Sequence, residues 1–279
     1  MCKLKNKITA YIIFYNNEDT VKESISSLLA QTINIDQIIL IDDGSSDNSY
    51  SEASSFNLPI IRNKSNLGRG FSRSVAHEYS NNEFVLSLDA TNILPKDFID
   101  NSLNWFVDEK VAAVYGRITQ REKNTLSEKW RSVHLFKDQI KQEIKVNYTF
   151  ISYGSIIKTN SYNKVSGYNK DLRFNEDNDL GKKLIKSGCN IVFDPNLEVI
   201  SISNESILKT LERYSRWYSG YGNIPKLGNY LRNIIYSITC MVKEDFKNKY
   251  YSCIFVSLVC PHFHFLYQFY LFGRKSLWK

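Results

Sequence analysis

Residues 37–47 read QIILIDDGSSD, a run of four Ile and Leu residues that ends in two aspartates and a glycine. An uninterrupted apolar run of this length, closed by turn residues, is typical of a strand that is buried on both faces. Similar runs begin at Ile8 and Phe84, and amphipathic stretches separate them. This alternation predicts an α/β fold in which βαβ units build a mostly parallel sheet flanked by helices.

The periodicity of apolar residues gives the expected positions of the elements. One face of a helix after the first strand is expected to hold Val21, Ile25, Leu28 and Leu29. Strands are expected at 8–15, 37–41, 84–88, 111–118 and 151–157, and further helices at 68–80, 96–107 and 176–187. The length of 279 residues favours one large α/β domain with an appendage.

The composition is that of a globular protein. Hydrophobic residues make up 43% and charged residues 23%, which excludes a collagen-like, low-complexity or wholly disordered chain. The net charge is +7, but residues 226–279 hold eight basic and two acidic side chains and so account for +6 of it. An even basic coat would favour nucleic acid as a partner, whereas this concentration in the tail favours an anionic membrane surface.

The cysteines and the first residues indicate the compartment. The five cysteines are scattered and form no CxxC pair, which argues against a disulfide framework and a zinc site and favours a reducing environment. Residues 1–20 lack the apolar run and cleavage site of a secretory signal. We therefore expect a cytoplasmic protein.

The tail contains a long uncharged stretch. Residues 250–273 carry no Asp, Glu, Lys or Arg and are flanked by basic residues, and about 20 residues are enough to span a bilayer. Nine of these 24 residues are Tyr or Phe, and Pro261, His262, His264 and Gln268 interrupt the run, which also suits the headgroup boundary. An interfacial or re-entrant helix pair, a membrane span and a soluble helical cap remain open.

Carboxylates recur where strands are expected to end. Asp42 and Asp43 follow one strand, Asp89 follows another, and Glu176 and Asp177 open a helix. In an open parallel sheet, ligands bind outside the carboxyl ends of the strands. These residues therefore mark the expected site.

Six strings occur in the order found in one known family. They are Phe14-Tyr-Asn16, Ser27-Leu-Leu-Ala-Gln-Thr32, Ile41-Asp-Asp-Gly-Ser-Ser-Asp47, Asn66-Leu-Gly-Arg-Gly-Phe-Ser-Arg73, Leu88-Asp-Ala-Thr-Asn-Ile-Leu-Pro95 and Asn175-Glu-Asp-Asn-Asp-Leu180. In this the chain resembles family 2 glycosyltransferases of the GT-A fold over about residues 8–222. The resemblance implies an inverting, hexosyltransferase-like enzyme that uses a nucleoside-diphosphate sugar.

The resemblance also implies roles for individual residues. Asp177 would be the general base, with Glu176 beside it, and the helix dipole would favour the ionised form of Asp177. Arg213-Tyr-Ser-Arg-Trp217 resembles the motif that flanks the diphosphate and the acceptor sugar in processive members, through Arg213, Arg216 and Trp217. The implied donor-binding residues are Tyr15, Asn16, Asp43, Ser45, Arg73 and Asp89.

One motif departs from the family pattern. The DxD signature, whose second acid holds Mg²⁺ or Mn²⁺, reads Asp89-Ala90-Thr91 here, followed by Asn92. A hydroxyl is a poor substitute for a carboxylate on a hard divalent cation. No histidine lies at 201–204, where the family often has a metal ligand. Either a weakly bound divalent cation rests on Asp89, or cationic side chains stabilise the diphosphate, or the protein no longer catalyses.

The sequence therefore predicts a GT-A catalytic domain over 1–225 and a helical, basic and apolar membrane-associating segment over 226–279. The expected enzyme transfers a sugar to a saccharide or lipid-linked acceptor in the synthesis of a cell-surface polysaccharide, at the inner face of the cell membrane, without nucleic acid. The alternative is a catalytically weakened sugar-nucleotide-binding or scaffold protein of a glycan assembly complex. A nucleotidyltransferase would require a basic glycine-rich loop where residues 16–19 are acidic.

Overall fold

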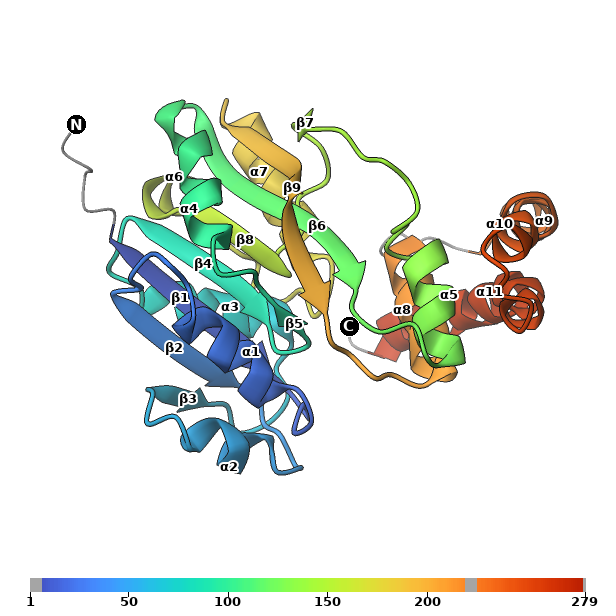
Figure 1. Ribbon diagram of the computed structural model, residues 1–279, viewed down its shortest axis with the longest axis horizontal. Coiled ribbons are helices and arrows are strands. Elements are labelled where there is room, and N and C mark those ends of the chain that lie inside the picture. Colours follow the sequence, from blue (N-terminus) through green and yellow to red (C-terminus); the bar gives the residue numbers. More distant parts are fainter. Residues whose placement is uncertain (1–6, 219–224, 278–279) are drawn as a thin grey trace. The chain divides into compact units, whose positions relative to one another are not determined.

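Nine strands form one mixed sheet in the computed structural model, which describes residues 7–218 and 225–277 (Figure 1). The order along the sheet is β3-β2-β1-β4-β8-β6-β9-β5, and β7 pairs with β9. The strands are β1 (Ile8–Phe14), β2 (Gln37–Asp42), β3 (Ile60–Arg62), β4 (Phe84–Asp89), β5 (Asn92–Ile93), β6 (Val111–Gln120), β7 (Lys145–Val146), β8 (Gly154–Lys158) and β9 (Asn190–Ser201).

Strands β1 to β4 form the parallel part of the sheet. Every residue of β1 is buried, and Ile12 lies opposite Leu40 on one side and Leu88 on the other. A central parallel strand is covered on both faces, which is why its sequence is apolar without alternation. The expected α/β class is confirmed.

The other half of the sheet is antiparallel, so the sheet is mixed rather than mostly parallel. Strand β8 pairs antiparallel with both β4 and β6, and β9 pairs antiparallel with β5 and β7. Strand β8 begins at Gly154 and not at 151, because its partner Leu88 is one residue from the end of β4.

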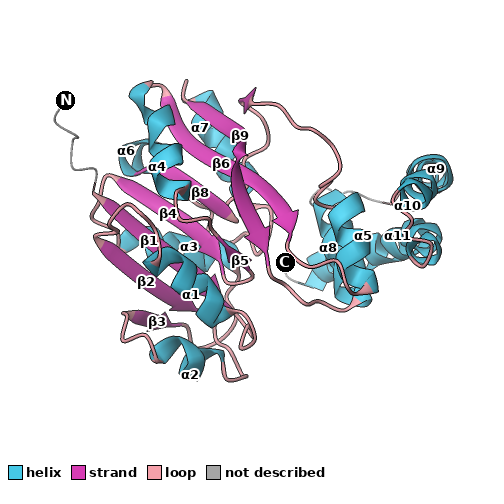
Figure 2. Cartoon of the chain, viewed as in Figure 1, coloured by secondary structure: helices cyan, strands magenta, loops and turns pink. Residues whose placement is uncertain are grey.

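Helices lie against both faces of this sheet (Figure 2). The helices expected at 68–80 and 176–187 are confirmed as α3 and α7, and the one at 96–107 is a short α-helix followed by a 3₁₀ turn. These helices are α1 (Val21–Leu29), α2 (Ser49–Ser54), α3 (Arg69–Glu78), α4 (Phe98–Leu103), the 3₁₀ turn Asn104–Val107, α6 (Thr159–Lys164) and α7 (Glu176–Lys186).

The chain divides into two compact units, and both are discontinuous in sequence. The first contains residues 1–118 and 142–203, and the second contains 119–141 and 204–279. The second unit is helical: α5 (Leu126–His134), α8 (Ile207–Tyr218), α9 (Leu227–Tyr236), the π-helical turn Ser237–Met241, α10 (Val242–Lys247) and α11 (Cys253–Leu277). A functional boundary at 225 stays a prediction, and residues 219–224 just before it lie outside the described residues.

A buried polar cluster joins three helices of the second unit. Ser257 of α11 accepts a hydrogen bond from the indole N–H of Trp130 at 3.0 Å and donates to Asp245 at 2.6 Å. The ring of His134 lies 2.7 Å from the other carboxylate oxygen of Asp245. Because burying such groups costs free energy unless they are paired, these bonds fix α5, α10 and α11 to one another.

Candidate functional site

Three parallel strands end at one edge of the sheet and bring polar residues together there. Strand β1 leads into Tyr15, β2 leads into Asp43, and β4 ends at Asp89. Strand β8 is antiparallel to β4, so its beginning lies at the same edge, where the Asp89 N–H donates to the Tyr153 carbonyl at 3.4 Å. Since ligands of open α/β sheets bind outside the carboxyl ends of the strands, this edge is the candidate site.

Asp43 connects the end of β2 to the loop before α3. Its Oδ1 accepts hydrogen bonds from the Asn63 amide at 2.8 Å and from the Leu67 N–H at 3.0 Å, and its Oδ2 accepts from the Gly68 N–H at 2.9 Å. Gly68 has φ 91°, a conformation that glycine adopts readily. An ionised carboxylate has about four lone-pair positions, so one remains for a ligand, and donor binding by Asp43 stays a prediction.

Replacing this carboxylate tests both of its roles. In Asp43→Ala three donors of the loop lose their acceptor, and we expect the free energy of unfolding to fall by at least about 1–3 kcal/mol. We also expect weaker binding of nucleoside diphosphates, measured by calorimetry next to a urea titration. If the variant and the parent bound nucleoside diphosphates with equal affinity, the role of Asp43 would be only to hold the loop before α3.

The loops after β1 and β2 are also bonded to each other. The Asn16 N–H donates to the Ser45 hydroxyl at 3.1 Å, and the Asn16 side-chain oxygen accepts from the Ser46 N–H at 2.9 Å. Tyr15 is 44% exposed beside this junction. The structure therefore brings together Tyr15, Asn16 and Ser45, as expected, with the Tyr15 ring accessible to a ligand.

Arg73 is the centre of a buried ion-pair network. It is 2% exposed, its Nη2 lies 2.7 Å from Asp89 Oδ1, and its Nε lies 3.1 Å from Glu176 Oε1. Its Nη1 donates to the Ser87 hydroxyl and to the Ser152 carbonyl. Burial acts to lower the pKa of Arg73, but Asp89, Glu176 and two buried tyrosines together outweigh it and raise the pKa, so the guanidinium is charged.

This network bears on two of the expected site residues. The side chain of Arg73, expected to contact the donor, is enclosed, and its N–H groups donate to residues of the chain. Glu176, expected to act with the base, is 2% exposed and held by Arg73. Both residues fix the positions of Asp89 and of the start of α7, and their roles toward donor and acceptor stay predictions.

Of the adjacent acids Glu176 and Asp177, Asp177 is the one that reaches the surface. It is partly exposed in the first turn of α7, while Leu180 and Leu184 on the same helix are fully buried and anchor it. Burial, and then the charge of Glu176, raise the pKa of Asp177 to about 7. The direction agrees with the opposing effect of the neighbouring Glu176 carboxylate, and the contribution of the helix dipole stays a prediction.

The residues around Asp89 do not fit a divalent cation. Asp89 already faces Arg73 at 2.7 Å and Arg69 at 3.9 Å. Thr91 brings no charge, and the Asn92 amide is buried and donates to the Tyr153 carbonyl at 3.1 Å. Among the described residues, no group of three His, Cys, Asp or Glu side chains is arranged to hold a metal.

Arg69 is a second cation of the string Asn66–Arg73 that lies beside Asp89. Its side chain is 51% exposed, and its Nη2 lies 3.9 Å from Asp89 Oδ2. Asp89 raises the pKa of Arg69, with burial opposing. Its place in the string, four residues before Arg73, makes it a cationic candidate for the diphosphate from the sequence alone, and that role stays a prediction.

The predicted diphosphate and acceptor residues belong to the second unit. Arg213 is paired with Glu205, whose other oxygen lies 3.6 Å from Arg131. Arg216 is exposed, and Trp217 is 41% exposed with its ring near that of Phe136. Their roles stay predictions.

Most of the first unit matches the model of a known protein family. The model of glycosyl transferase family 2 matches residues 9–170. A UDP-Glc:alpha-D-GlcNAc-diphosphoundecaprenol beta-1,3-glucosyltransferase of Escherichia coli is 28% identical over 105 residues, which are 37% of this chain and 42% of that protein. A poly-beta-1,6-N-acetyl-D-glucosamine synthase of Staphylococcus aureus is 28% identical over 45% of this chain and 32% of its own length. The chain thus spans less than half of these curated relatives.

Solved structures share the fold. S. aureus TarS 1–349 in complex with UDP-GlcNAc has a TM-score of 0.57 at 15% identity, and the match covers 75% of this chain and 65% of the TarS chain. Mannosyltransferase PcManGT of Pyrobaculum calidifontis, in complex with GDP-Man and Mn²⁺, has a TM-score of 0.62 at 12% identity. The match covers 98% of this chain and 87% of the PcManGT chain. The fold expected from the sequence motifs is confirmed.

Proposed function

From the premise that the chain belongs to glycosyl transferase family 2, we propose that it moves a sugar from a nucleoside-diphosphate donor to an acceptor hydroxyl with inversion. The observation that carries this proposal is the pair of acids at the start of α7. Glu176 is buried and fixed by Arg73, and the adjacent Asp177 is partly exposed with a raised pKa. One acid positions the helix and the other is free to react.

The reaction requires a base close to the acceptor. The acceptor oxygen attacks the anomeric carbon, the bond from that carbon to the diphosphate oxygen breaks, and the acceptor proton passes to Asp177. A pKa near the working pH suits this role, because the group must accept the proton and later release it. The single displacement gives inversion.

The donor would lie at the edge where β1, β2 and β4 end. The exposed ring of Tyr15 and the Asp43 carboxylate would contact the nucleoside, and Asp89, which Arg73 orients, would contact the ribose. Arg69 is the accessible cation for the diphosphate. The names of the relatives suggest a uridine donor carrying glucose or N-acetylglucosamine.

A weak dependence on metal follows from Thr91. We expect the wild-type protein to retain most of its turnover in EDTA, because Asp89 alone is a poor site for Mg²⁺ or Mn²⁺. Thr91→Asp should tighten Mn²⁺ binding, since a second carboxylate adds attraction that a hydroxyl lacks. Calorimetric titration with Mn²⁺ measures this directly. Complete loss of wild-type activity in EDTA, restored by micromolar Mn²⁺, would contradict the expectation.

The proposal includes the acceptor and the location. A saccharide or lipid-linked acceptor at the inner face of the cell membrane suits the relatives, one of which is named for a diphosphoundecaprenol substrate, and suits the long apolar helix Cys253–Gly273. The product would be a surface glycan.

A thermal-shift panel tests the function as a whole. A donor that binds the folded state stabilises it by mass action, so UDP-, GDP-, dTDP- and CMP-sugars are compared with and without Mn²⁺. We expect one nucleotide class to raise the melting temperature. Binding without transfer to any acceptor would favour a sugar-nucleotide-binding scaffold protein, and no binding at all would refute both functions.

A further inference from the structure

The second unit exposes two apolar stripes on neighbouring helices. On α9 and the turn after it, the stripe contains Leu227, Leu231, Ile235 and Ile238, each more than half exposed. On α11 it contains Phe255, Leu258, Leu266, Phe269 and Phe272, which are between 42% and 73% exposed. Spacings of three, four and eight residues place each set on one side of its helix. Exposed apolar area of this extent marks a surface that meets a partner.

The two stripes border the same seam. The Tyr230 ring stacks on that of Phe265 with centroids 4.4 Å apart, and the Tyr230 hydroxyl lies 2.7 Å from Nδ1 of His262. His262 is exposed and follows the spacing of the α11 stripe. We call these two stripes together the apolar face.

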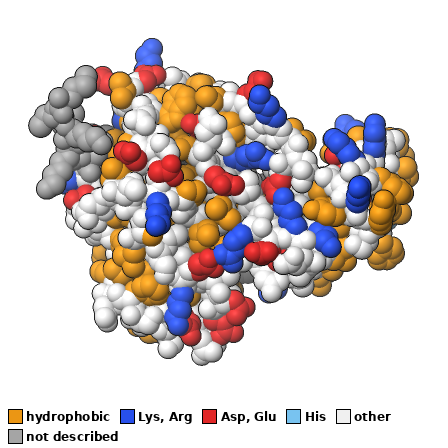
Figure 3. Space-filling model, viewed as in Figure 1, with side chains coloured by type: hydrophobic (Ala, Val, Ile, Leu, Met, Phe, Trp, Pro, Cys, Tyr) orange, Lys and Arg blue, Asp and Glu red, His pale blue; other side chains and the backbone are white. Residues whose placement is uncertain are grey.

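Basic side chains accompany this face. Arg232, Lys243, Lys247 and Lys249 are exposed on α9, α10 and the turn that follows. The only acids of the segment 226–251 are Glu244 and the buried Asp245. In Figure 3, Lys and Arg side chains stand beside hydrophobic surface at the second unit. Apolar surface with a basic margin is complementary to a bilayer that contains anionic lipids.

The side of α11 opposite its apolar stripe is buried in the second unit, which argues against a membrane span. Helix Cys253–Gly273 has the length and apolar composition to cross a bilayer, but Cys253, Val256 and Cys260 are buried against the rest of the unit. On the same flank, Ser257 holds the buried carboxylate of Asp245. A span would have to take that carboxylate and the charged helix α10 into hydrocarbon, which is strongly unfavourable.

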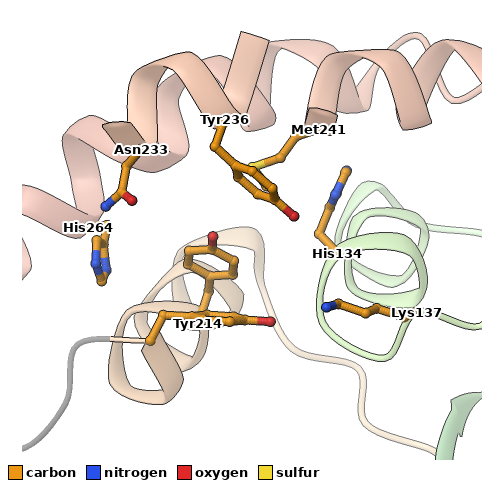
Figure 4. Close-up of a pocket in the computed structure, with 8 residues that line it drawn as sticks. His134, Lys137, Tyr214, Asn233, Tyr236, Met241 and His264 are labelled. Carbon is orange, nitrogen blue, oxygen red and sulfur yellow. The ribbon is translucent and has the colours of Figure 1, made fainter. Parts of the chain in front are cut away.

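A polar cavity lies on the same inner side of α11. It measures about 230 Å³ and is lined by residues of α5, α8, α9 and α11 and of the turns after α5 and α9, among them His134, Lys137, Asn233, Tyr236 and His264 (Figure 4). His264 is 4% exposed, and its Nδ1 finds no hydrogen-bond partner among the described residues. The inner side of α11 thus borders polar side chains of its own unit, in contrast to the apolar face.

We propose that α9 and α11 lie in the headgroup region of an anionic bilayer, with the apolar face inserted, and that neither helix spans it. This inference deepens the location included in the proposed function, and it rests on the exposed stripes and the buried flank of α11.

Vesicle flotation of the full chain tests the proposal. We expect the protein to float with vesicles of phosphatidylcholine and phosphatidylglycerol, to bind pure phosphatidylcholine at least tenfold less, and to be released by alkaline carbonate. Leu266→Glu with Phe269→Glu should lower the bound fraction at least tenfold. Lys243→Gln with Lys247→Gln should weaken binding and reduce its dependence on salt. Leu29→Glu, the same change at an exposed leucine of α1, is the matched control and should bind as the parent does.

Three outcomes would overturn the proposal: no flotation, retention through the carbonate wash, or a stable dimer in solution that does not bind vesicles. Circular dichroism melting of each variant separates loss of binding from loss of fold. The thermal shift of the same variants with UDP reports the donor site independently. A UDP shift with no flotation refutes only the membrane contact. Flotation without a shift, with UDP or with any other nucleotide of the thermal-shift panel, refutes only the transferase function.

Discussion

Asp177→Asn is expected to lower the turnover number by about 10² or more, the usual loss when a positioned general base is removed. The amide keeps the size of the carboxylate but cannot accept the acceptor proton. Donor affinity should persist, because Asp177 is assigned to the acceptor side. The measurement is single-turnover transfer with the donor that the thermal-shift panel identifies.

The same helix supplies a control. Asp179→Asn changes an acid two residues away that is paired with Lys183 at 2.8 Å and partly exposed, and it should leave turnover nearly unchanged. If both variants were equally impaired, the loss would come from the helix and not from the base. If Asp177→Asn turned over like the parent, the base would have to be another residue.

The raised pKa of Asp177 gives this assignment a pH signature. Below about pH 7 the carboxyl is protonated and cannot act as a base, so the rate should rise with pH through that region and level off above it. Because burial and Glu176 cause the shift, Glu176→Gln should move the midpoint to lower pH. A midpoint that stays in place would show that another group titrates.

Arg73→Met is expected to cause the largest loss of stability. It leaves the Glu176 carboxylate, only 2% exposed, without its cation and also removes a partner of Asp89. Breaking a buried ion pair from one side typically costs about 3–5 kcal/mol. Urea unfolding monitored by fluorescence measures the change.

Arg69→Met is the matched control for this variant. Its side chain is 51% exposed and its Nη2 lies 3.9 Å from Asp89, so its loss should change the free energy of unfolding by less than about 1 kcal/mol. In the double variant Arg73→Met with Glu176→Gln, part of the stability should return, because the unpaired charge is gone. Equal destabilisation by Arg69→Met and Arg73→Met would contradict the central position of Arg73.

The sequence predicted the strands well because burial on both faces leaves a plain signal. The run at 37–41 and the strand that begins at Ile8 required no tertiary information. The inward position of Arg73 could not be predicted in this way. Its partners Ser87, Ser152 and Glu176 are 14, 79 and 103 residues away, and a helical arginine gives no local sign of such contacts.

The set of helices that form the second unit could not be predicted either, because their contacts join residues that are far apart in sequence. Helix α5 lies between two strands of the sheet in sequence, yet the Trp130 indole bonds to Ser257, 127 residues later. Apolar periodicity predicts that a helix has a buried side, but not what covers it. The basic, aromatic tail was recognisable from composition alone.

The interleaving of the two units determines the order in which they can form during synthesis. Helix α5 emerges from the ribosome long before α10 and α11, the helices that complete its polar cluster. Until the last residues are released, the Trp130 side chain has no native cover from them, and the loop that must close is long. A chain that ends at residue 225 would keep the sheet and the contacts of α8 with this helix, but it would lack the cover from α10 and α11, so it should tend to aggregate.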